Sequence, residues 1–183
     1  MRIVGGRLGG RTLSAPKSQA IRPTADRLRE ALFNILTHSY GDPVEGARVL
    51  DLFAGTGALG LEALSRGAAH VTFLDSDASA VRLIGENLRK LGETAAAKVV
   101  PADALRPPPG RDPCDLVFLD PPYRSGHAAP ALAALAQAGW VAPGAVVTVE
   151  LAHNEDIVPP PGFAAIDERR YGAAKIVILR HAS

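Results

Sequence analysis

The hydrophobic positions of this chain recur with two different spacings. Short apolar runs, typical of strands buried on both faces of a sheet, alternate with segments whose apolar residues recur every three or four positions, as in helices. The apolar runs predict strands at 48–53, 70–75, 97–102, 115–120 and 144–151. The helical spacing predicts helices at 22–36, 58–67, 77–92 and 128–138. Strands that alternate with helices indicate an α/β fold, with a mostly parallel sheet covered by helices on both faces.

The two ends of the chain depart from this alternation. Residues 162–172 and 174–180 predict a closing antiparallel hairpin, because two strand-like segments flank a short turn. In the first 20 residues, glycines separate short apolar stretches, which predicts a hairpin or an extended arm. We therefore predict an arm or hairpin at 1–20 and one domain at 21–183, which is long enough to bury a core of its own.

Composition excludes several classes of protein. With 47% hydrophobic and 21% charged residues, the chain is neither disordered nor fibrous. No apolar run approaches the ~18 residues of a membrane span, and the start lacks the apolar core of a signal peptide. Cys114 is the single cysteine, which excludes a disulfide framework and a cysteine-based zinc site. We expect a cytoplasmic monomer with no membrane partner and no metal.

Charge is unevenly distributed along the chain. Residues 1–29 contain seven arginine or lysine residues and one acid, a net charge of +6. The whole chain carries +1, so residues 30–183 carry −5. A basic arm on a mildly acidic body suits a polyanionic partner, and a solvated terminus with no partner fits the composition equally well.

Four acids stand at or near the carboxyl ends of predicted strands: Asp51, Asp75, Asp103 and Asp120. Open parallel sheets bind their ligands at that end of the strands. The residues before each acid are so apolar that an ordinary solvated surface does not explain the set. The four acids therefore mark the predicted binding site.

A glycine-rich loop follows the first predicted strand. "DLFAGTGALGLEAL" carries Gly55, Gly57 and Gly60 at the spacing of dinucleotide-binding loops, where glycines let a ligand approach the backbone at the start of a helix. Asp75 stands 20 residues after Gly55, at the end of the second strand, where an acid binds ribose hydroxyls. The loop by itself fits a nicotinamide-dependent dehydrogenase as well as an S-adenosylmethionine enzyme.

Two features favour S-adenosylmethionine. Asp51 places a carboxylate beside the loop, where it is unwelcome to a pyrophosphate but suits the positive amine or sulfonium of this cofactor. The segment "DPPY", residues 120–123, has no role in hydride transfer. The Asp120 carboxylate and the Pro121 carbonyl can accept the N–H hydrogens of a nucleobase amine, localise its lone pair and aim it at a methyl group. Tyr123 offers a face on which an extruded base can stack.

With these motifs the chain resembles the class I S-adenosylmethionine-dependent methyltransferases that carry a (D/N)PP(Y/F) motif. Within them it is similar to the bacterial 16S rRNA guanine-N2 methyltransferases of the RsmD type, through "RIVGGRLGGRTL", "RPTADRLREALFNIL", "DLFAGTGALGLEALSRGA" and "DPPY". The resemblance covers nearly the whole chain. It implies a Rossmann-like, seven-stranded sheet with the last strand antiparallel, S-adenosylmethionine as methyl donor, and a guanine of 16S rRNA, free or in a small-subunit particle, as acceptor.

The resemblance also implies roles for individual residues. The methionine part of the cofactor would be lined by Asp51, Gly55, Thr56 and Gly57. The ribose would be held by Asp75, where many relatives have Glu, and the adenine would be met by Asp103 and Ala104. The acceptor base would be received by Asp120, Pro121 and Tyr123. RNA would be contacted by Arg22 and Thr24 near the site, and by Arg2, Arg7 and Arg11 in the arm.

Two other functions stay open. A DNA adenine-N6 or cytosine-N4 methyltransferase would share every cofactor residue, although the chain has no separate target-recognition domain. A non-catalytic RNA-binding assembly factor could keep the fold, although the intact glycine loop and "DPPY" argue against it. The arm arginines recur every four or five residues and so cannot all face one side of a strand. We therefore expect a flexible clamp that orders on RNA.

Overall fold

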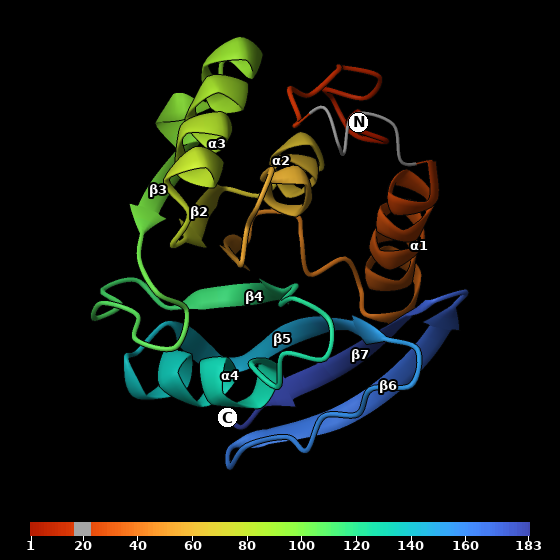
Figure 1. Ribbon diagram of the computed structural model, residues 1–183, viewed down its shortest axis with the longest axis vertical. Coiled ribbons are helices and arrows are strands. Elements are labelled where there is room, and N and C mark those ends of the chain that lie inside the picture. The colour runs from red at the N-terminus through yellow and green to blue at the C-terminus, as the bar shows by residue number, and fades with distance from the viewer. Residues whose placement is uncertain (17–22) are drawn as a thin grey trace.

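Within the residues that the computed structural model describes, 1–16 and 23–183, seven strands form one mixed sheet (Figure 1). They are β1 (Arg48–Leu52), β2 (His70–Asp75), β3 (Ala97–Pro101), β4 (Cys114–Leu119), β5 (Val141–Ala152), β6 (Phe163–Tyr171) and β7 (Ala174–His181). Their order in the sheet is β3-β2-β1-β4-β5-β7-β6. The first five strands pair in parallel, and β7 runs antiparallel to both neighbours, β5 and β6. The predicted Rossmann-like sheet with a reversed last strand is confirmed.

Helices cover both faces of this sheet. The described chain contains α1 (Pro23–Ser39), α2 (Ala58–Ser65), α3 (Ala78–Leu91), α4 (Ala128–Gln137) and a short 3₁₀ turn, η2 (Thr94–Ala96). The first three helices lie on one face and α4 on the other (Figure 1). Because successive strand residues point to opposite faces, Val49 belongs to the core with Phe33 of α1, whereas Leu50 belongs to the core with Leu132 of α4. The site therefore stands on a rigid, doubly covered sheet.

The turn from β2 into α3 is fixed by its own side chains. Asp77, which the sequence suggested as the cap of α3, accepts hydrogen bonds from the backbone N–H of Ser79 at 2.6 Å and Ala80 at 3.3 Å. The helix ends at Gly92, whose φ of 76° is left-handed.

Across the described residues, none of the helices has the length and apolar character needed to cross a membrane.

Residues 1–14 pack against the body of the protein. Ile3 and Leu13 are buried, and Arg2 pairs with Thr12 in an antiparallel bridge. The backbone N–H of Ser14 donates a 2.8 Å hydrogen bond to the side chain of Asn87 in α3. The expectation of a flexible clamp is therefore wrong for these residues, because buried side chains and hydrogen bonds hold them in place.

Glu62 is the residue onto which this segment docks. Its carboxylate is fully buried in α2 and accepts hydrogen bonds from the backbone N–H of Val4 at 2.9 Å and of Gly5 at 2.8 Å. Arg29 and Arg66 donate to the same carboxylate, at 3.3 and 2.9 Å, and supply its counter-charge. A buried carboxylate is tolerated when it is paired and hydrogen-bonded in this way. The start of the chain is thereby fixed beside α1 and α2.

Candidate active site

The carboxyl ends of the parallel strands meet at one end of the sheet, and the four predicted acids lie there. Asp75 is the last residue of β2, and Asp120 follows β4 directly. Asp103 stands two residues beyond β3, and Asp51 one residue before the end of β1. Two cavities open at this end of the sheet. The walls common to both are formed by Phe53, Gly55, Thr56, Asp120, Tyr123 and Glu150.

The first of these, the glycine-loop cavity, has a volume of about 810 Å³. It lies between the loop after β1, the turn after β2 and the segment after β4. It brings together eight of the predicted residues, namely Gly55, Thr56, Asp75, Asp103, Ala104, Asp120, Pro121 and Tyr123. Its volume is within the roughly 300–1,000 Å³ of typical small-molecule sites. The structure therefore gathers most of the predicted cofactor residues around one space.

The glycine loop owes its shape to packing. Gly57 has a φ of +78°, which favours glycine, and a Cβ there would come within 3.1 Å of Ile84. A Cβ at Gly60 would lie 2.3 Å from the Phe73 ring, so α2 can approach β2 only because Gly60 has no side chain. Gly57 is buried and lines neither cavity, so its role in the structure is to shape the turn into α2.

Asp75 ties the glycine loop to the end of β2. One carboxylate oxygen accepts a 2.8 Å hydrogen bond from the backbone N–H of Gly55, and the other accepts a 2.9 Å bond from that of Asp77. Each oxygen of an ionised carboxylate has a further acceptor position, so Asp75 can also receive ribose hydroxyls. On the neighbouring strand end, beyond β3, the backbone N–H of Leu105 donates to Asp103 at 2.9 Å and lowers the pKa of that carboxyl.

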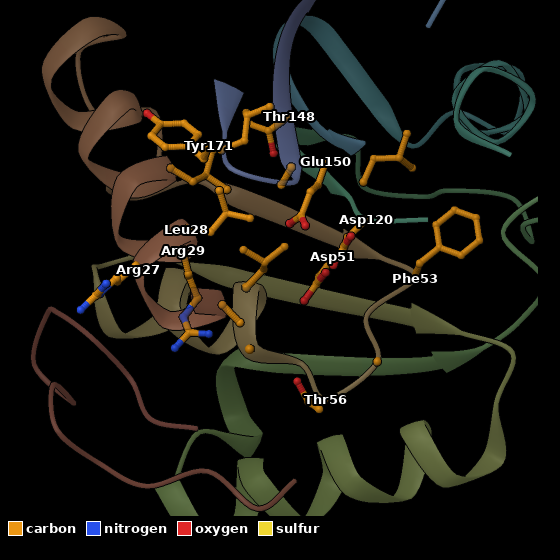
Figure 2. A pocket seen from close by; sticks show the side chains of 18 of the residues that line it. Arg27, Leu28, Arg29, Asp51, Phe53, Thr56, Asp120, Thr148, Glu150 and Tyr171 are labelled. Carbon is orange, nitrogen blue, oxygen red and sulfur yellow. The ribbon is translucent and has the colours of Figure 1, made fainter. Parts of the chain in front are cut away.

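The second cavity, the helix-side cavity, has a volume of about 640 Å³ and lies beneath α1 (Figure 2). Its apolar walls include Leu28 of α1 and Ile176 of β7. Figure 2 shows the carboxylates of Asp51, Asp120 and Glu150 pointing into the same part of this cavity. The cavity therefore presents acceptor oxygens at its floor and apolar surface along its sides.

Asp51 is the most deeply buried of these acids. It is 1% exposed, and one oxygen accepts a 2.9 Å hydrogen bond from the backbone N–H of Gly60. The pKa of its carboxyl is raised to about 8, mainly by burial and in smaller part by the nearby Asp75, against the opposing effect of that hydrogen bond. Asp51 lines the helix-side cavity and not the glycine-loop cavity. It thus faces the helix-side cavity, although the resemblance had implied a place beside the cofactor.

Asp120 and Glu150 form a close acidic pair where the two cavities meet. Burial raises the pKa of Asp120 well above its usual value, and the neighbouring carboxylates of Glu150 and Asp51 add to this effect. Burial also raises the pKa of Glu150, whereas the hydroxyl of Tyr123, which donates to Glu150 at 2.6 Å, opposes that rise. The pair therefore retains a proton to a higher pH than exposed carboxyls do.

Glu150 was missed in the sequence analysis. It lies near the carboxyl end of β5, in the apolar run "VVTVEL", so it meets the same criterion that identified the four aspartates. Phe53, which lines both cavities, was missed as well. It has a φ of +56°, rare for a bulky residue, and its ring stacks on His127 with a centroid distance of 6.3 Å. Nothing in the local pattern signals that conformation.

The predicted RNA-binding residues fall into different environments. Arg2 and Arg11 are exposed. Arg7 is also exposed, but its guanidinium forms two 2.6 Å hydrogen bonds with the two oxygens of Glu93. Arg22 lies outside the described residues, and Thr24 stands in the first turn of α1.

Known proteins are similar to this chain over most of its length. A family model described as "Conserved hypothetical protein 95" matches residues 1–180. The Ribosomal RNA small subunit methyltransferase D of Haemophilus influenzae is 35% identical over 176 residues, which are 94% of this chain and 89% of the relative. The protein of the same name from Escherichia coli K12 is 42% identical over 151 residues, 82% of this chain and 74% of the relative.

Solved structures show the same architecture over the full length. The structure of yhhF from Escherichia coli has a TM-score of 0.84 and 34% identity, and the match covers 100% of this chain and 98% of that one. A hypothetical protein of Thermus thermophilus has a TM-score of 0.73 and 32% identity, with 97% of this chain and 98% of that one covered. The chain therefore belongs to the family described as Conserved hypothetical protein 95, together with these ribosomal RNA small subunit methyltransferase D relatives.

Proposed function

We propose that this protein transfers a methyl group from S-adenosylmethionine to the exocyclic N2 amine of a guanine in 16S rRNA. The observation that carries the proposal is the meeting of two cavities at Asp120 and Tyr123 of the "DPPY" segment. One cavity suits a nucleoside cofactor and the other an extruded base, so that donor and acceptor would meet at this segment. The relatives named as ribosomal RNA small subunit methyltransferases support both the reaction and the substrate.

The residues around the glycine-loop cavity fit this cofactor. Asp75 offers acceptor oxygens for the ribose hydroxyls, and Asp103 and Ala104 flank a place for the adenine. Bound there, S-adenosylmethionine supplies an activated methyl group on a positively charged sulfur. Asp120 lies at the boundary of this cavity with the helix-side cavity, so the acceptor amine would be held beside the activated methyl group.

The "DPPY" segment prepares the acceptor amine. The Asp120 carboxyl group and the Pro121 carbonyl accept the two N–H hydrogens, which localises the nitrogen lone pair and aims it at the methyl carbon. With the cofactor bound, the amine nitrogen would take the methyl group, and the electron pair of the broken carbon–sulfur bond would remain on sulfur. The extra proton on nitrogen then passes to Asp120 in its ionised form, or to water. The raised pKa of Asp120 suits it to receive that proton.

Tyr123 holds the base during this step. Its side chain is 44% exposed and lines both cavities, so the ring is accessible to a stacked base. Arg27, on the exposed side of α1, lines the helix-side cavity and is placed to meet the phosphates that flank an extruded nucleotide. Arg2 and Arg11 extend the basic surface along the docked N-terminal segment. On this proposal the protein acts as a monomer in the cytoplasm. Its partner is 16S rRNA, either free or within a small-subunit particle.

An assay with purified protein and methyl-labelled S-adenosylmethionine tests the proposal. Unmodified 16S rRNA and double-stranded DNA are offered in parallel, and the products are digested to nucleosides. We expect label in RNA, as N2-methylguanosine, and no label with the Asp120→Ala variant. Label in DNA as N6-methyladenine or N4-methylcytosine would overturn the proposal in favour of a DNA methyltransferase. No label in any nucleic acid would favour a non-catalytic role.

A further inference from the structure

We propose that Glu150 selects guanine among amine-bearing bases by accepting the N1–H that stands beside the reacting N2 amine. The inference rests on the proposed function and assigns a specificity role to a residue outside the glycine loop and "DPPY". It is carried by the juxtaposition of Glu150 with Asp120 and Tyr123 where the two cavities meet.

The sheet places Glu150 beside Asp120. Strands β4 and β5 pair in parallel, and their register brings Leu119 opposite Val149. The next residue along each strand is Asp120 and Glu150, so these two acids are neighbours across the strand ends. Residues directly opposite in a sheet share a face, and both side chains point into the helix-side cavity (Figure 2).

Tyr123 orients the Glu150 carboxylate. Its hydroxyl donates a 2.6 Å hydrogen bond to Oε1 of Glu150, which leaves Oε2 to face a ligand. Burial raises the pKa of Glu150, and the hydroxyl donor opposes that rise, so this bond favours the ionised form of Glu150 that accepts a hydrogen bond. Tyr123, on which the base would stack, and Glu150, which would select it, are thus joined by a hydrogen bond.

The Watson–Crick edges of the bases distinguish guanine under this arrangement. Guanine presents two kinds of donor side by side, its N2 amine and its N1–H, and two adjacent acids can accept from both. Adenine presents its N6 amine beside N1, and cytosine its N4 amine beside N3, and each of these ring nitrogens carries a lone pair and no hydrogen. Placed with its amine on Asp120, either base would set that lone pair against the Glu150 carboxylate. A partly buried carboxylate left without its donor is unfavourable, so the arrangement rejects both bases.

The remaining wall of the helix-side cavity strengthens this selection. Leu28, Leu119 and Ile176 line part of the cavity with apolar surface, which offers no hydrogen-bond partner to an unmatched polar group. Sites built to hydrogen-bond a particular N–H reject analogues that lack it far more strongly than sites that measure size alone. We therefore expect discrimination against bases without the N1–H to be large.

The test uses base analogues that keep the 2-amino group and lack the N1–H. 2-Aminopurine and 2,6-diaminopurine both carry the amine at C2 beside an unprotonated N1. Each is placed at the methylated position of a 16S rRNA segment, once that position is mapped by nucleoside mass spectrometry. The measurement is kcat/KM for methyl transfer to the guanine RNA and to the two analogue RNAs, for wild type, Glu150→Gln and Glu86→Gln. Glu86 is exposed on α3 and lines neither cavity, so it serves as the matched control.

Wild type and the control are expected to prefer guanine by roughly 100-fold or more. Glu150→Gln should shrink this preference by about tenfold or more, because a glutamine amide can donate to an unprotonated N1. Tyr123→Phe keeps the ring but removes the donor to Glu150, so it should reduce the preference for guanine by a smaller factor. This variant replaces Glu150→Gln in the test if Glu150→Gln does not fold. Equal kcat/KM of wild type for guanine and 2-aminopurine RNA, or an unchanged preference in Glu150→Gln, would overturn the inference. Failure of wild type to methylate the guanine RNA at all would instead overturn the proposed function.

Discussion

The side chains of Tyr123 and Glu150 meet across the ends of β4 and β5, although they are 27 residues apart in the chain. The tyrosine hydroxyl donates a 2.6 Å hydrogen bond to the glutamate, while the tyrosine ring stays accessible at the rim of both cavities. Two prolines separate Asp120 from Tyr123 and restrict the backbone between them. The hydrogen bond to Glu150 therefore helps to fix the Tyr123 ring relative to the Asp120 carboxyl group.

Removing the Tyr123 ring should weaken RNA capture. For Tyr123→Ala we expect a loss of roughly 1–3 kcal/mol in binding, the size of one lost base stack. Tyr123→Phe keeps the ring and should retain most of the affinity. Both are measured as RNA dissociation constants in the presence of the demethylated cofactor product. If Tyr123→Ala binds RNA as tightly as wild type, the base does not stack on this ring.

Replacing Asp120 should separate catalysis from stability. Asp120→Ala removes an acceptor for the amine, so the rate of methyl transfer should fall by about 10²–10³-fold or more. Cofactor affinity should stay nearly intact, since the proposed partner of Asp120 is the acceptor amine. The protein should not lose stability at neutral pH, because burial disfavours the ionised form of this carboxyl. The methyl-transfer rate, the cofactor affinity by calorimetry and the thermal unfolding of Asp120→Ala are measured against wild type. A variant that turns over as fast as wild type would refute the role of Asp120 as an acceptor for the amine.

Asp75 should matter for cofactor affinity. Asp75→Ala removes the acceptor proposed for the ribose and also the two hydrogen bonds to Gly55 and Asp77 that hold the loop. We expect S-adenosylmethionine binding to weaken by about 1–3 kcal/mol, the range of a lost charge-assisted hydrogen bond. Calorimetry measures this, and an equal loss of affinity for adenosine alone would locate the effect at the nucleoside. Unchanged affinity would remove Asp75 from the ribose role.

Asp51 should make stability fall as pH rises. Its pKa is about 8 in the folded protein against an ordinary value of 3.8. Between these values the folded protein binds more protons than the unfolded chain, so the free energy of unfolding decreases from about pH 4 to about pH 8. Asp51→Asn keeps an acceptor for the Gly60 N–H but cannot ionise. This variant should flatten the pH dependence of stability. Its free energy of unfolding at pH 8 should exceed that of wild type by more than about 1 kcal/mol.

Urea denaturation of both proteins at pH 5, 6, 7 and 8 measures the Asp51 effect. Glu30→Gln, which changes an exposed acid on α1, is the control and should follow wild type. Parallel curves for wild type and Asp51→Asn would show that Asp51 titrates normally.

The arm arginines should differ in their contribution to RNA binding. Arg2 and Arg11 are exposed, so replacing both by alanine should reduce the slope of log affinity against log salt by about two. Arg7 is engaged by Glu93, so Arg7→Ala should instead lower the free energy of unfolding, by about 1 kcal/mol. RNA affinity across a salt series and denaturant unfolding separate the two effects. An unchanged slope in the double variant would place the RNA surface elsewhere.

Much of the fold could be predicted because its signals are local. The alternation of apolar runs with helical spacing marks each parallel strand, and Asp75 and Asp120 mark strand ends through their immediate neighbours. Gly60 could be recognised by spacing alone. The reason for it, the Phe73 ring 2.3 Å from where a Cβ would lie, is not a local feature. The structure therefore brings most of the residues on these motifs together around one cavity, as their positions along the chain predict.

The missed features depend on contacts between distant parts of the chain. Glu62 reads as an ordinary helical glutamate, yet it anchors the backbone of Val4, 58 residues earlier, and that anchor turns an expected flexible arm into a docked segment. Glu150 meets the local criterion of an acid near a strand end, but its pairing with Asp120 follows only from the register of β4 and β5. The glycine-rich segment has no periodicity from which its docking could be predicted.

The most direct test of the central claim is nucleoside mass spectrometry of 16S rRNA from cells that carry this gene, lack it, or express only the Asp120→Ala variant. We expect N2-methylguanosine at one additional position in the first case, and its loss in the other two. Identical N2-methylguanosine content in all three samples would contradict the proposed reaction.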